Sequence, residues 1–584
     1  MIGFAGIYLK QGEWTSKFDD ELHVMIKQLQ GAESCNMESF SFVSEKGIRS
    51  KCTVINANQS FTSFKTDTTE GFVNGYVYGS VDWNTYTANA DVAQKLNGAF
   101  NVVSFDRQTS ALHIVRDRGG AKSCFYYDGG DYILFASGLR AISKSPLYVT
   151  RSINKEALWM NIAFPAPPQP LTCFKDIWST ERGTLLSISA LGVSSAKYWE
   201  IPSRSVDNGL SYNDAVQQTH EALNSAVQTS CTGEAIGSTL SGGVDSAYLT
   251  ALAHEANPDV EAFTFKLKDP KFDQLNEDDV ATLTAQKHGI KHHVEEVDFE
   301  SMMEDFSQLI KLYEQPGISL GAYFSISKIG HRLGFNNVVN GLAGDELYGG
   351  FHFFKHLEYW WLLRLASPIG QMVPSNTHAG FDKLKKISGA RSIDEYYSRA
   401  FATFLDPELA LLFKSDRYDA LETLSRLYNP DKASFEDHTS GLLHYMFANC
   451  PNHHLYRFET FANHFGISGI YPFLDNRVID TAFSIPSQFK VKGHKRKMVL
   501  KSAAKPWVVQ PALTENKRGV GAPVKSWMKD LLASVVDEKL AALKQRDLFD
   551  ADYIDHMVKT YPSAYGKKIW KLVMTELWIE EFLD

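Results

Sequence analysis

Ser241-Gly242-Gly243-Val244-Asp245-Ser246 is the most informative stretch of the sequence, because an apolar segment from Ala235 to Leu240 leads into it and a helical pattern follows. Two glycines allow a tight turn and a close approach of the backbone to a ligand. The hydroxyls of Ser241 and Ser246, with the free N–H groups at the start of the helix, suit phosphate oxygens. The stretch therefore predicts a phosphate-binding turn, with Asp245 within reach of a magnesium ion.

Other interpretations of the glycine pair fit less well. A Walker A loop ends in Gly-Lys-Ser/Thr, which is missing, and a dinucleotide-binding turn needs a third glycine where Ser246 stands. A plain glycine turn explains neither the two serines nor the aspartate. The stretch resembles the SGGxDS signature of PP-loop ATP pyrophosphatases, which split ATP into AMP and pyrophosphate, and this resemblance implies ATP as a ligand.

Length and charge limit the possible classes of protein. A chain of 584 residues is too long for one ordinary core and predicts two or three domains. Its 44% hydrophobic and 22% charged residues are typical of soluble globular proteins. A formal net charge of −9 argues against a general nucleic-acid binder, which needs a basic face.

The six cysteines are scattered and form no C-x-x-C pair, so neither a disulfide scaffold nor a zinc site is predicted. The short apolar run from Ile2 to Leu9 follows no basic region, and no segment approaches the eighteen apolar residues of a membrane span. We therefore expect a cytoplasmic protein with neither a membrane nor a nucleic acid as partner.

The hydrophobic pattern changes along the chain. Up to about residue 200, short alternating strands with turns dominate, whereas from Tyr212 onward amphipathic helical patterns alternate with short apolar runs. The polar, turn-rich segment from Ile201 to Gly209 separates the strand-like pattern from the helical one. We predict an amino-terminal domain over residues 1–205 and an α/β domain with a parallel sheet over residues 206–584.

Four stretches of the amino-terminal half follow one another in the order of a known family: Phe4-Ala5-Gly6-Ile7-Tyr8, Asn74-Gly75-Tyr76-Val77-Tyr78, Leu96-Asn97-Gly98-Ala99-Phe100 and Arg116-Asp117-Arg118-Gly119-Gly120. They resemble the class II glutamine amidotransferase domain of asparagine synthetases. The resemblance implies an Ntn-hydrolase-like αββα sandwich.

The residues that hydrolyse glutamine in that family are not matched. Its nucleophile is a cysteine at position 2, where this chain has Ile2, and no cysteine occurs before Cys35. The family's aspartate in Leu-Asp-Gly-Met-Phe is Asn97, and its substrate-binding arginine falls near Lys51. We therefore expect no glutamine hydrolysis, and Asn74 with Gly75 to serve a turn, since an oxyanion hole needs a nucleophile.

The carboxy-terminal half continues the resemblance, with matching stretches at Glu314-Gln315-Pro316, Asn340 to Gly350, Pro472-Phe473-Leu474-Asp475, and Asn516 to Val520. It is similar to the ligase domain of asparagine synthetase-like amide ligases, a group that includes β-lactam synthetases, carbapenam synthetases and lasso-peptide cyclases. The resemblance implies that a carboxylate attacks the α-phosphorus of ATP, pyrophosphate leaves, and an amine attacks the acyl adenylate.

The same resemblance assigns the central residues of the site. Asp245 and Asp345 correspond to magnesium ligands, because each lies in a turn after an apolar strand. Lys497, in the basic stretch from Gly493, corresponds to the family's essential lysine, whose ammonium can stabilise charge on pyrophosphate. The ordinary alternatives are a helix cap for Asp345 and a solvated basic loop for Lys497, the latter also covering Lys492 and Lys495.

The nucleotide needs further contacts. The apolar run from Val260 to Phe265 predicts a second strand beside the phosphate turn, with backbone contacts to adenine and ribose from Phe263, Phe265 and Lys266. We also expect Leu240 and Gly341 to line the nucleotide cleft.

Two positions depart from the amide ligase pattern. Leu342 stands where asparagine synthetases carry an acidic residue and β-lactam synthetases a tyrosine, so another group must serve as base. Glu459 is the candidate, with a helix-surface carboxylate as the alternative. The family's Glu-x-Arg before Pro472 is Ser468-Gly469-Ile470, which argues against an aspartate-like substrate.

An aromatic stretch after the Asp345 turn, from Phe351 to Trp361, suits either a hydrophobic core or a larger apolar substrate. The leading hypothesis is therefore an ATP-dependent carboxylate–amine ligase of specialised metabolism, such as antibiotic biosynthesis, with small-molecule, peptide or carrier-bound substrates. An ammonia-dependent asparagine synthetase, a lasso-peptide cyclase and an ATP-binding pseudoenzyme scaffold are the alternatives, and a homodimer is possible.

Overall fold

The computed structural model describes residues 3–31, 35–44, 47–56, 61–203, 209–317, 321–365, 386–428, 435–450, 454–514, 524–529, 532–560 and 565–584. The predicted domain boundary at 205/206 and the Asn516 to Val520 stretch lie outside these residues. Among the described helices, none is long and apolar enough to cross a membrane.

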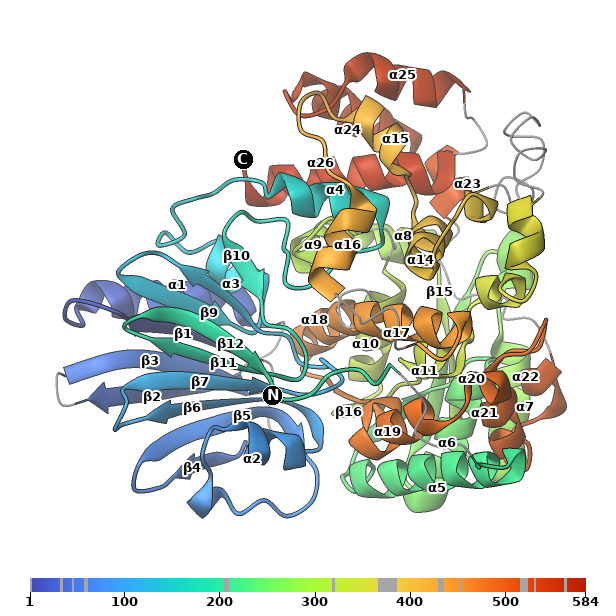
Figure 1. The fold of residues 1–584 in the computed structure, drawn as a ribbon, viewed down its shortest axis with the longest axis horizontal. Helices are drawn as coiled ribbons and strands as arrows, with labels where there is room; N and C mark the ends of the chain where they lie inside the picture. The colour runs from blue at the N-terminus through green and yellow to red at the C-terminus, as the bar shows by residue number, and fades with distance from the viewer. Residues whose placement is uncertain are drawn as a thin grey trace.

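The amino-terminal half contains two six-stranded antiparallel sheets (Figure 1). The first runs β10 (Ile177–Ser179), β8 (Phe125–Asp128), β9 (Tyr132–Ala136), β1 (Gly3–Leu9), β3 (Gly47–Asn56), β2 (Asn36–Ser44). The second runs β12 (Gly192–Lys197), β11 (Thr184–Ser189), β7 (Ala111–Arg116), β6 (Gly98–Asp106), β5 (Thr69–Val77), β4 (Ser63–Lys65).

The two sheets face each other across a hydrophobic core. Phe4 of β1 packs on Phe72 of β5 with ring centroids 5.7 Å apart, and Phe42 of β2 stacks on Phe105 of β6 at 5.4 Å. Helices α1 (Ser16–Leu29) and α3 (Leu139–Ser143) lie on the outer side of the first sheet, and α2 (Ala90–Lys95) lies by the second. The predicted αββα sandwich is confirmed.

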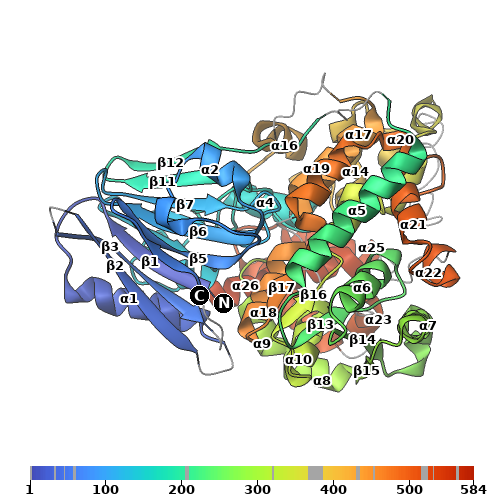
Figure 2. The same ribbon diagram turned by 90° about the horizontal axis from the view of Figure 1, so that it is seen from below.

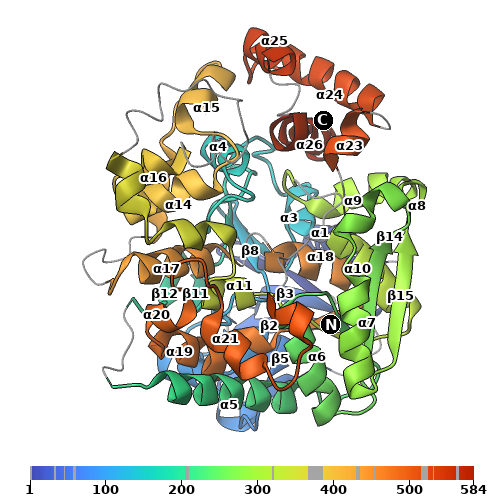
Figure 3. The same cartoon turned by 90° about the vertical axis from the view of Figure 1, so that its right-hand side faces the viewer.

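The carboxy-terminal half is built on a five-stranded sheet in the order β15 (His292–Val297), β14 (Glu261–Leu267), β13 (Ile236–Thr239), β16 (Asn337–Val339), β17 (Ser468–Ile470). All four pairings are parallel, which confirms the predicted α/β class. Helices α6 (Val244–Ala256) and α7 (Asp278–His288) lie on one face, and α10 (Ala322–Arg332) and α18 (Tyr456–His464) lie on the other (Figures 2 and 3).

This strand order fixes the place of the site. The chain moves outward from β13 to β15 and then returns to the opposite side of β13 with β16. In open α/β sheets, ligands bind at the carboxyl ends of the strands where the order reverses. The turn after β13 and the turn after β16 therefore lie side by side at the binding edge.

Further helices surround the sheet: α4 (Lys155–Ala163), α5 (Tyr212–Ser230), α8 (Phe299–Glu304), α9 (Phe306–Tyr313), α11 (Gly344–Tyr348), α14 (Ile393–Phe401), α15 (Asp406–Leu412), α16 (Ala420–Tyr428), α17 (His438–Cys450), α19 (Asn476–Ser484), α20 (Ser487–Lys490), α21 (Met498–Ala504), α22 (Gln510–Thr514), α23 (Val524–Lys529), α24 (Ala533–Gln545), α25 (Ala551–Thr560) and α26 (Trp570–Phe582).

Glu314 joins the two halves. Its carboxylate, 1% exposed, accepts hydrogen bonds from Leu139 N and Arg140 Nε, both at 2.8 Å, and from the Tyr456 hydroxyl. Its carbonyl accepts a hydrogen bond from Trp578 Nε1 at 3.0 Å. The Glu-Gln-Pro landmark of the sequence therefore anchors the amino-terminal half to α18 and α26.

We predict that Glu314→Ala lowers the free energy of unfolding by about 3 kcal/mol, because it leaves buried donors without their acceptor. Chemical denaturation measures this loss. Glu304→Ala, at an exposed position of α8, is the matched control. Equal denaturation midpoints for the two variants would contradict the anchor.

Candidate active site

The phosphate turn is held in shape by its two serines. Ser241 N donates to Ser246 Oγ at 3.0 Å, the two hydroxyl oxygens lie 2.9 Å apart, and Gly243 N donates to Ser241 Oγ at 3.2 Å. Helix α6 begins at Val244, with no side-chain cap on its first turn. The turn thus presents a helix N-terminus and two hydroxyls to one point, which suits phosphate oxygens.

The turn after β16 packs directly on the phosphate turn. A Cβ at Gly341 would lie 3.3 Å from Asp245 Cβ, and one at Gly344 would lie 2.9 Å from Asp245 Oδ1. Ala343 adopts a left-handed φ of 75°, a conformation that costs a non-glycine residue energy and clusters at functional sites. Glycines at positions 341 and 344 therefore allow the two turns to approach each other.

Lys497 connects both turns. Its ammonium lies 2.5 Å from Asp345 Oδ1 and also pairs with Asp245 Oδ2. The side chain is buried, and the residue has a left-handed φ of 53° immediately before α21. Three residues predicted separately from the sequence therefore meet in one charged cluster at the carboxyl edge of the sheet.

Neighbouring basic residues surround this cluster. Arg496 Nη1 donates to the carbonyl of Gly350 at 2.5 Å, which fixes the loop before Lys497 against the turn that carries Asp345. Burial lowers the pKa of Lys501, and the positive charges of Lys497 and Arg496 lower it further. Gly350 is required for the packing, because a Cβ there would overlap Asp345 Oδ1 and Lys497 Cε.

The predicted nucleotide contacts lie on β13 and β14. Leu240 N donates to Phe263 O at 3.0 Å, so the backbone of Phe263 belongs to the sheet, and its buried ring stacks on Phe335 at 5.7 Å. Phe265 is half-buried, and Lys266 pairs with Asp278 at 3.4 Å. Contacts from these residues to adenine and ribose stay a prediction.

Glu459 lies at the boundary between the two halves. Its carboxylate accepts hydrogen bonds from Lys122 Nζ at 2.5 Å and from the Tyr471 hydroxyl at 2.5 Å, and it is 2% exposed. It is therefore no helix-surface carboxylate. The structure does not bring Glu459 into hydrogen-bond contact with Lys497, and its predicted role as base stays a prediction.

Lys122 is a residue that the sequence analysis missed. The Asp117 carboxylate accepts hydrogen bonds from the N–H groups of Phe100, Ala121 and Lys122, so the Arg-Asp-Arg-Gly-Gly landmark shapes the turn that carries this lysine. A Cβ at Gly75 would lie 3.1 Å from Lys122 Cε. A lone lysine near a glycine turn gives no sequence signal of a partner more than 300 residues away.

The glutaminase-like features have structural partners. The prediction of a turn at Asn74 and Gly75 is wrong, because both residues lie within β5 and pair with β6. Lys51 Nζ pairs with Asp19 at 2.6 Å. Asn97 Nδ2 donates to Asp475 Oδ2 at 2.9 Å. An aspartate at position 97 would oppose that carboxylate, so the asparagine matches its surroundings. Ile2 lies outside the described residues.

The predicted substrate-recognition positions are divided between core and surface. Ser468-Gly469-Ile470 forms β17 and is buried. Of the aromatic stretch, Phe353, Phe354 and Trp360 belong to the core, whereas Trp361 is 60% exposed. Leu342 is half-buried, and its N–H donates to Asn340 Oδ1 at 3.0 Å.

Comparisons with known proteins agree with this architecture. The model for the family described as asparagine synthase matches residues 218–580, and the model for the glutamine amidotransferase domain matches residues 84–199. Asparagine synthetase [glutamine-hydrolyzing] 1 of Bacillus subtilis is 22% identical over 630 residues, covering 99% of this chain and 96% of that protein.

A putative asparagine synthetase [glutamine-hydrolyzing] of Mycobacterium bovis is 22% identical over 542 residues, covering 88% of this chain and 80% of that protein. Among solved structures, the glutamine phosphoribosylpyrophosphate amidotransferase of B. subtilis covers 50% of this chain and 65% of its own, at 10% identity and a TM-score of 0.23.

The fold and the site together define an ATP-dependent amide ligase with an amidotransferase-like amino-terminal half. The chain belongs to the asparagine synthase family, whose model matches more than half of its length.

We predict that Gly350→Ala weakens ATP binding at least about tenfold, equivalent to about 1.4 kcal/mol, because the new methyl displaces Asp345 and Lys497. The displaced atoms are ends of flexible side chains, so the fold is retained. Titration calorimetry measures the affinity. Gly233→Ala is the control, since its Cβ would have no neighbour closer than 3.9 Å. Unchanged affinity for Gly350→Ala would exclude this cluster from the ATP site.

Proposed function

We propose that this chain joins a carboxylate to an amine through an acyl adenylate, releases AMP and pyrophosphate, and takes no nitrogen from glutamine. The buried Lys497 ammonium, within ion-pair distance of both Asp245 and Asp345, carries this proposal. Forming an acyl adenylate brings a carboxylate to a polyphosphate, so neutralisation and alignment of negative charge dominate the first step. A lysine held beside the phosphate turn supplies both.

Ser241, Gly242, Gly243 and Ser246 bind the departing pyrophosphate in this proposal, with the N-terminus of α6 supplying further N–H donors. Leu240 and Gly341 line the cleft on either side of the turn. Lys497 then holds the negative charge that develops on the phosphate oxygens and on the tetrahedral intermediate. Preorganised charge of this kind commonly contributes the largest part of catalysis.

The pair Asp245 and Asp345 fits a magnesium ion. Mg²⁺ is commonly held by one or two carboxylates together with substrate phosphates, and these two carboxylates already share one cation, the Lys497 ammonium. When bound, the ion would neutralise charge on the β- and γ-phosphates. No group of three or more metal-ligating residues is found in the described part of the chain, so the remaining ligands would come from ATP and water.

Three observations support independence from glutamine. Position 2 is isoleucine, the first two cysteines in the sequence are the half-buried Cys35 and the buried Cys52, and burial raises the pKa of Cys52. A buried thiol with a raised pKa is a poor nucleophile. The buried Lys122–Glu459 ion pair lies beside Gly75 at the contact between the two halves. The amine would therefore enter from solvent.

The substrates follow from what the site lacks. Ser468-Gly469-Ile470 is buried in β17 and offers no charged side chain to an aspartate. We therefore propose small-molecule, peptide or carrier-bound substrates of specialised metabolism, such as antibiotic biosynthesis, with the amide formed within one molecule or between two. The proposal includes a cytoplasmic location, no nucleic-acid or membrane partner, and a possible homodimer. Consumption of aspartate with ammonia would instead identify an asparagine synthetase.

We predict that wild-type protein incubated with ATP, magnesium and host-cell small molecules forms AMP and pyrophosphate, whereas Lys497→Ala forms them about a hundredfold to a thousandfold more slowly. Mass spectrometry of the mixture identifies the acid consumed. Lys492→Ala, at an exposed position of the same loop, serves as control and retains wild-type rates. Glutamine alone yields no glutamate.

ATP binding without AMP formation from any fraction would contradict the ligase proposal and favour the scaffold alternative. AMP formation that requires a peptide would favour the cyclase. Glutamate released from glutamine would overturn the independence from glutamine while leaving adenylation intact.

We predict that Glu459→Ala lowers the free energy of unfolding by about 3 kcal/mol, because it leaves the buried Lys122 ammonium without its carboxylate partner. Combining it with Lys122→Met removes that charge and restores most of the stability. If Glu459 is also the base, the double variant folds but stays inactive. A stable double variant with wild-type activity would leave Glu459 a purely structural role.

A further inference from the structure

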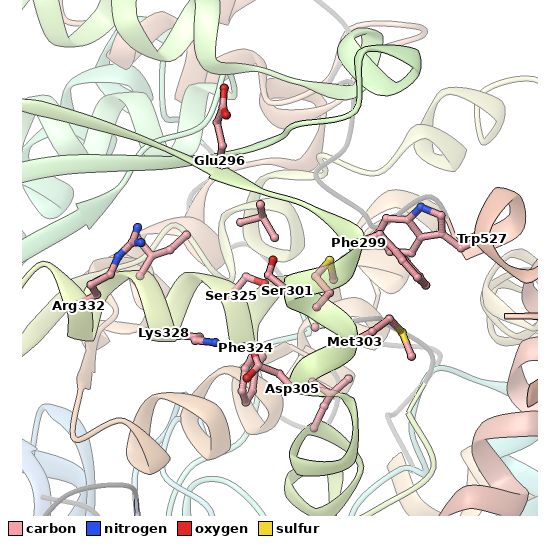
Figure 4. Close-up of a pocket in the computed structure, with 15 residues that line it drawn as sticks. Glu296, Phe299, Ser301, Met303, Asp305, Phe324, Ser325, Lys328, Arg332 and Trp527 are labelled. Atoms are coloured by element: carbon pink, nitrogen blue, oxygen red, sulfur yellow. Dashed lines mark hydrogen bonds and ion pairs between the residues drawn. The ribbon is translucent and has the colours of Figure 1, made fainter. Parts of the chain in front are cut away.

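A cavity of about 180 Å³ lies apart from the charged cluster, between α8, α9 and α10 at the carboxyl end of β15 (Figure 4). Its apolar wall is formed by Phe299, Met302, Met303, Leu309, Phe324 and Trp527. An apolar cavity of about 150 Å³ accepts a benzene ring. This cavity therefore has room for one aromatic ring or a short branched alkyl chain.

Trp527 connects the cavity to the nucleotide side of the sheet. Its ring meets Phe299 edge-on at 5.0 Å and Phe272 at 6.3 Å, and Phe272 belongs to the segment that follows β14. Since neighbouring strands lie about 4.8 Å apart, the carboxyl end of β15 is roughly 10 Å from that of β13. The cavity therefore lies at the carboxyl end of β15, with β14 between that strand and the one that leads into the phosphate turn.

One stripe of α10 contributes both apolar and polar groups to the cavity lining. Gly321, Phe324, Ser325, Lys328, Ile329 and Arg332 all line the cavity, at the spacing that places residues on one helix face. Gly321 precedes the helix and provides no side-chain cap, so the N-terminal N–H groups of this 11-residue helix favour a negative charge. The cavity therefore meets the positive end of a helix.

Ser325 is a second, independent sign of a polar ligand. It is 9% exposed, it lines the cavity, and its hydroxyl has no hydrogen-bond partner among the described residues. The hydroxyl oxygen is accessible from the cavity rather than sealed in the core, so a ligand or water there can complete its hydrogen bonds. The hydroxyl lies on the first turn of α10, where it adds a donor to those of the backbone.

Lys328 completes the donor set. Its ammonium pairs with Asp305 at 2.6 Å, and an ammonium has three donors, so two remain for a ligand. Arg332, the next residue on this stripe, pairs with Glu295. Asp305 and Glu296 are the two carboxylates on the cavity lining, and of the two Asp305 lies near Lys328 (Figure 4). Both cations of the stripe are therefore paired with a carboxylate, and an anionic ligand would share Lys328 with Asp305.

We propose that this cavity binds a compact apolar acid, either an aromatic or a branched alkyl carboxylate. The ring or alkyl group lies among Met302, Leu309 and Phe324, and the carboxylate accepts hydrogen bonds from Ser325, Lys328 and the N-terminus of α10. Because the bound carboxylate is held by α10, it is separate from any carboxylate presented to the phosphate turn. The ligand is therefore an independent acid or the far end of a larger substrate.

Titration calorimetry with 3-phenylpropionate tests the proposal, with 3-phenylpropanol and 3-phenylpropylamine as neutral and cationic analogues. We expect saturable binding of the acid to the full-length protein, and weaker binding of both analogues. Ser325→Val and Lys328→Met should each weaken acid binding at least about tenfold, since each removes a hydrogen bond to a charged group. Neither change should alter binding of the alcohol.

Three further variants locate the ligand. Ile329→Trp fills the cavity and should abolish binding of the acid, whereas Lys311→Met, an exposed lysine on α9, should leave it unchanged. Lys497→Ala should also bind the acid normally, which separates this test from that of the ligase proposal. Lys328 is largely exposed, so its variant remains informative if Ile329→Trp fails to fold.

Absence of saturable acid binding would overturn the proposal, as would equal affinity for acid and amine, or undiminished affinity in Lys328→Met. Consumption of the bound acid with AMP formation would identify the cavity as part of the substrate site. Binding without consumption would identify a separate ligand. Both of these outcomes support the site.

Discussion

The ammonium of Lys497 between Asp245 and Asp345 is the interaction on which the site depends. Two carboxylates brought together at a sheet edge repel each other, and a buried cation between them removes that repulsion. The cluster also fixes geometry, because its members come from the turn after β13, the turn after β16 and the loop before α21. Glycines at positions 341, 344 and 350 make this close packing possible, because a side chain there would contact Asp245, Asp345 or Lys497.

A second constraint is the contact between the halves. Glu314 binds α3 of the amino-terminal half and α26 near the carboxyl terminus, and Glu459 binds Lys122. Buried charges of this kind are costly unless both partners are present, so neither half is expected to keep its native interior when separated. This dependence gives the amino-terminal half a structural role, because its residues complete the buried contacts of the ligase half.

Sequence reasoning located residues whose roles depend on local pattern and strand order. Ser241 to Ser246 follow an apolar run, and the turn carrying Asp345 follows another, so parallel strands alone imply that they share an edge. Lys497 could be placed there only through family resemblance. The sequence could not predict the pairing of Glu459 with Lys122. The two residues come from different halves of the chain, and neither stands in a distinctive sequence pattern. Ser325 and Lys328 were missed for a similar reason, since their helical spacing reads as an ordinary amphipathic face.

The residues that depart from the family pattern each fit their neighbours in the structure. Asn97 faces Asp475, and Lys51 is held by Asp19, so each altered residue of the glutaminase-like half satisfies a neighbour. Leu342 places no titratable group beside the phosphate turn, whereas Asp245, Asp345 and Lys497 form a charged cluster there. Buried charges destabilise a fold unless they are paired or needed for function, so a protein that served only as a scaffold would be expected to lose the buried Lys497 cluster. Its presence in this chain therefore favours a working amide ligase over a protein that has lost catalysis.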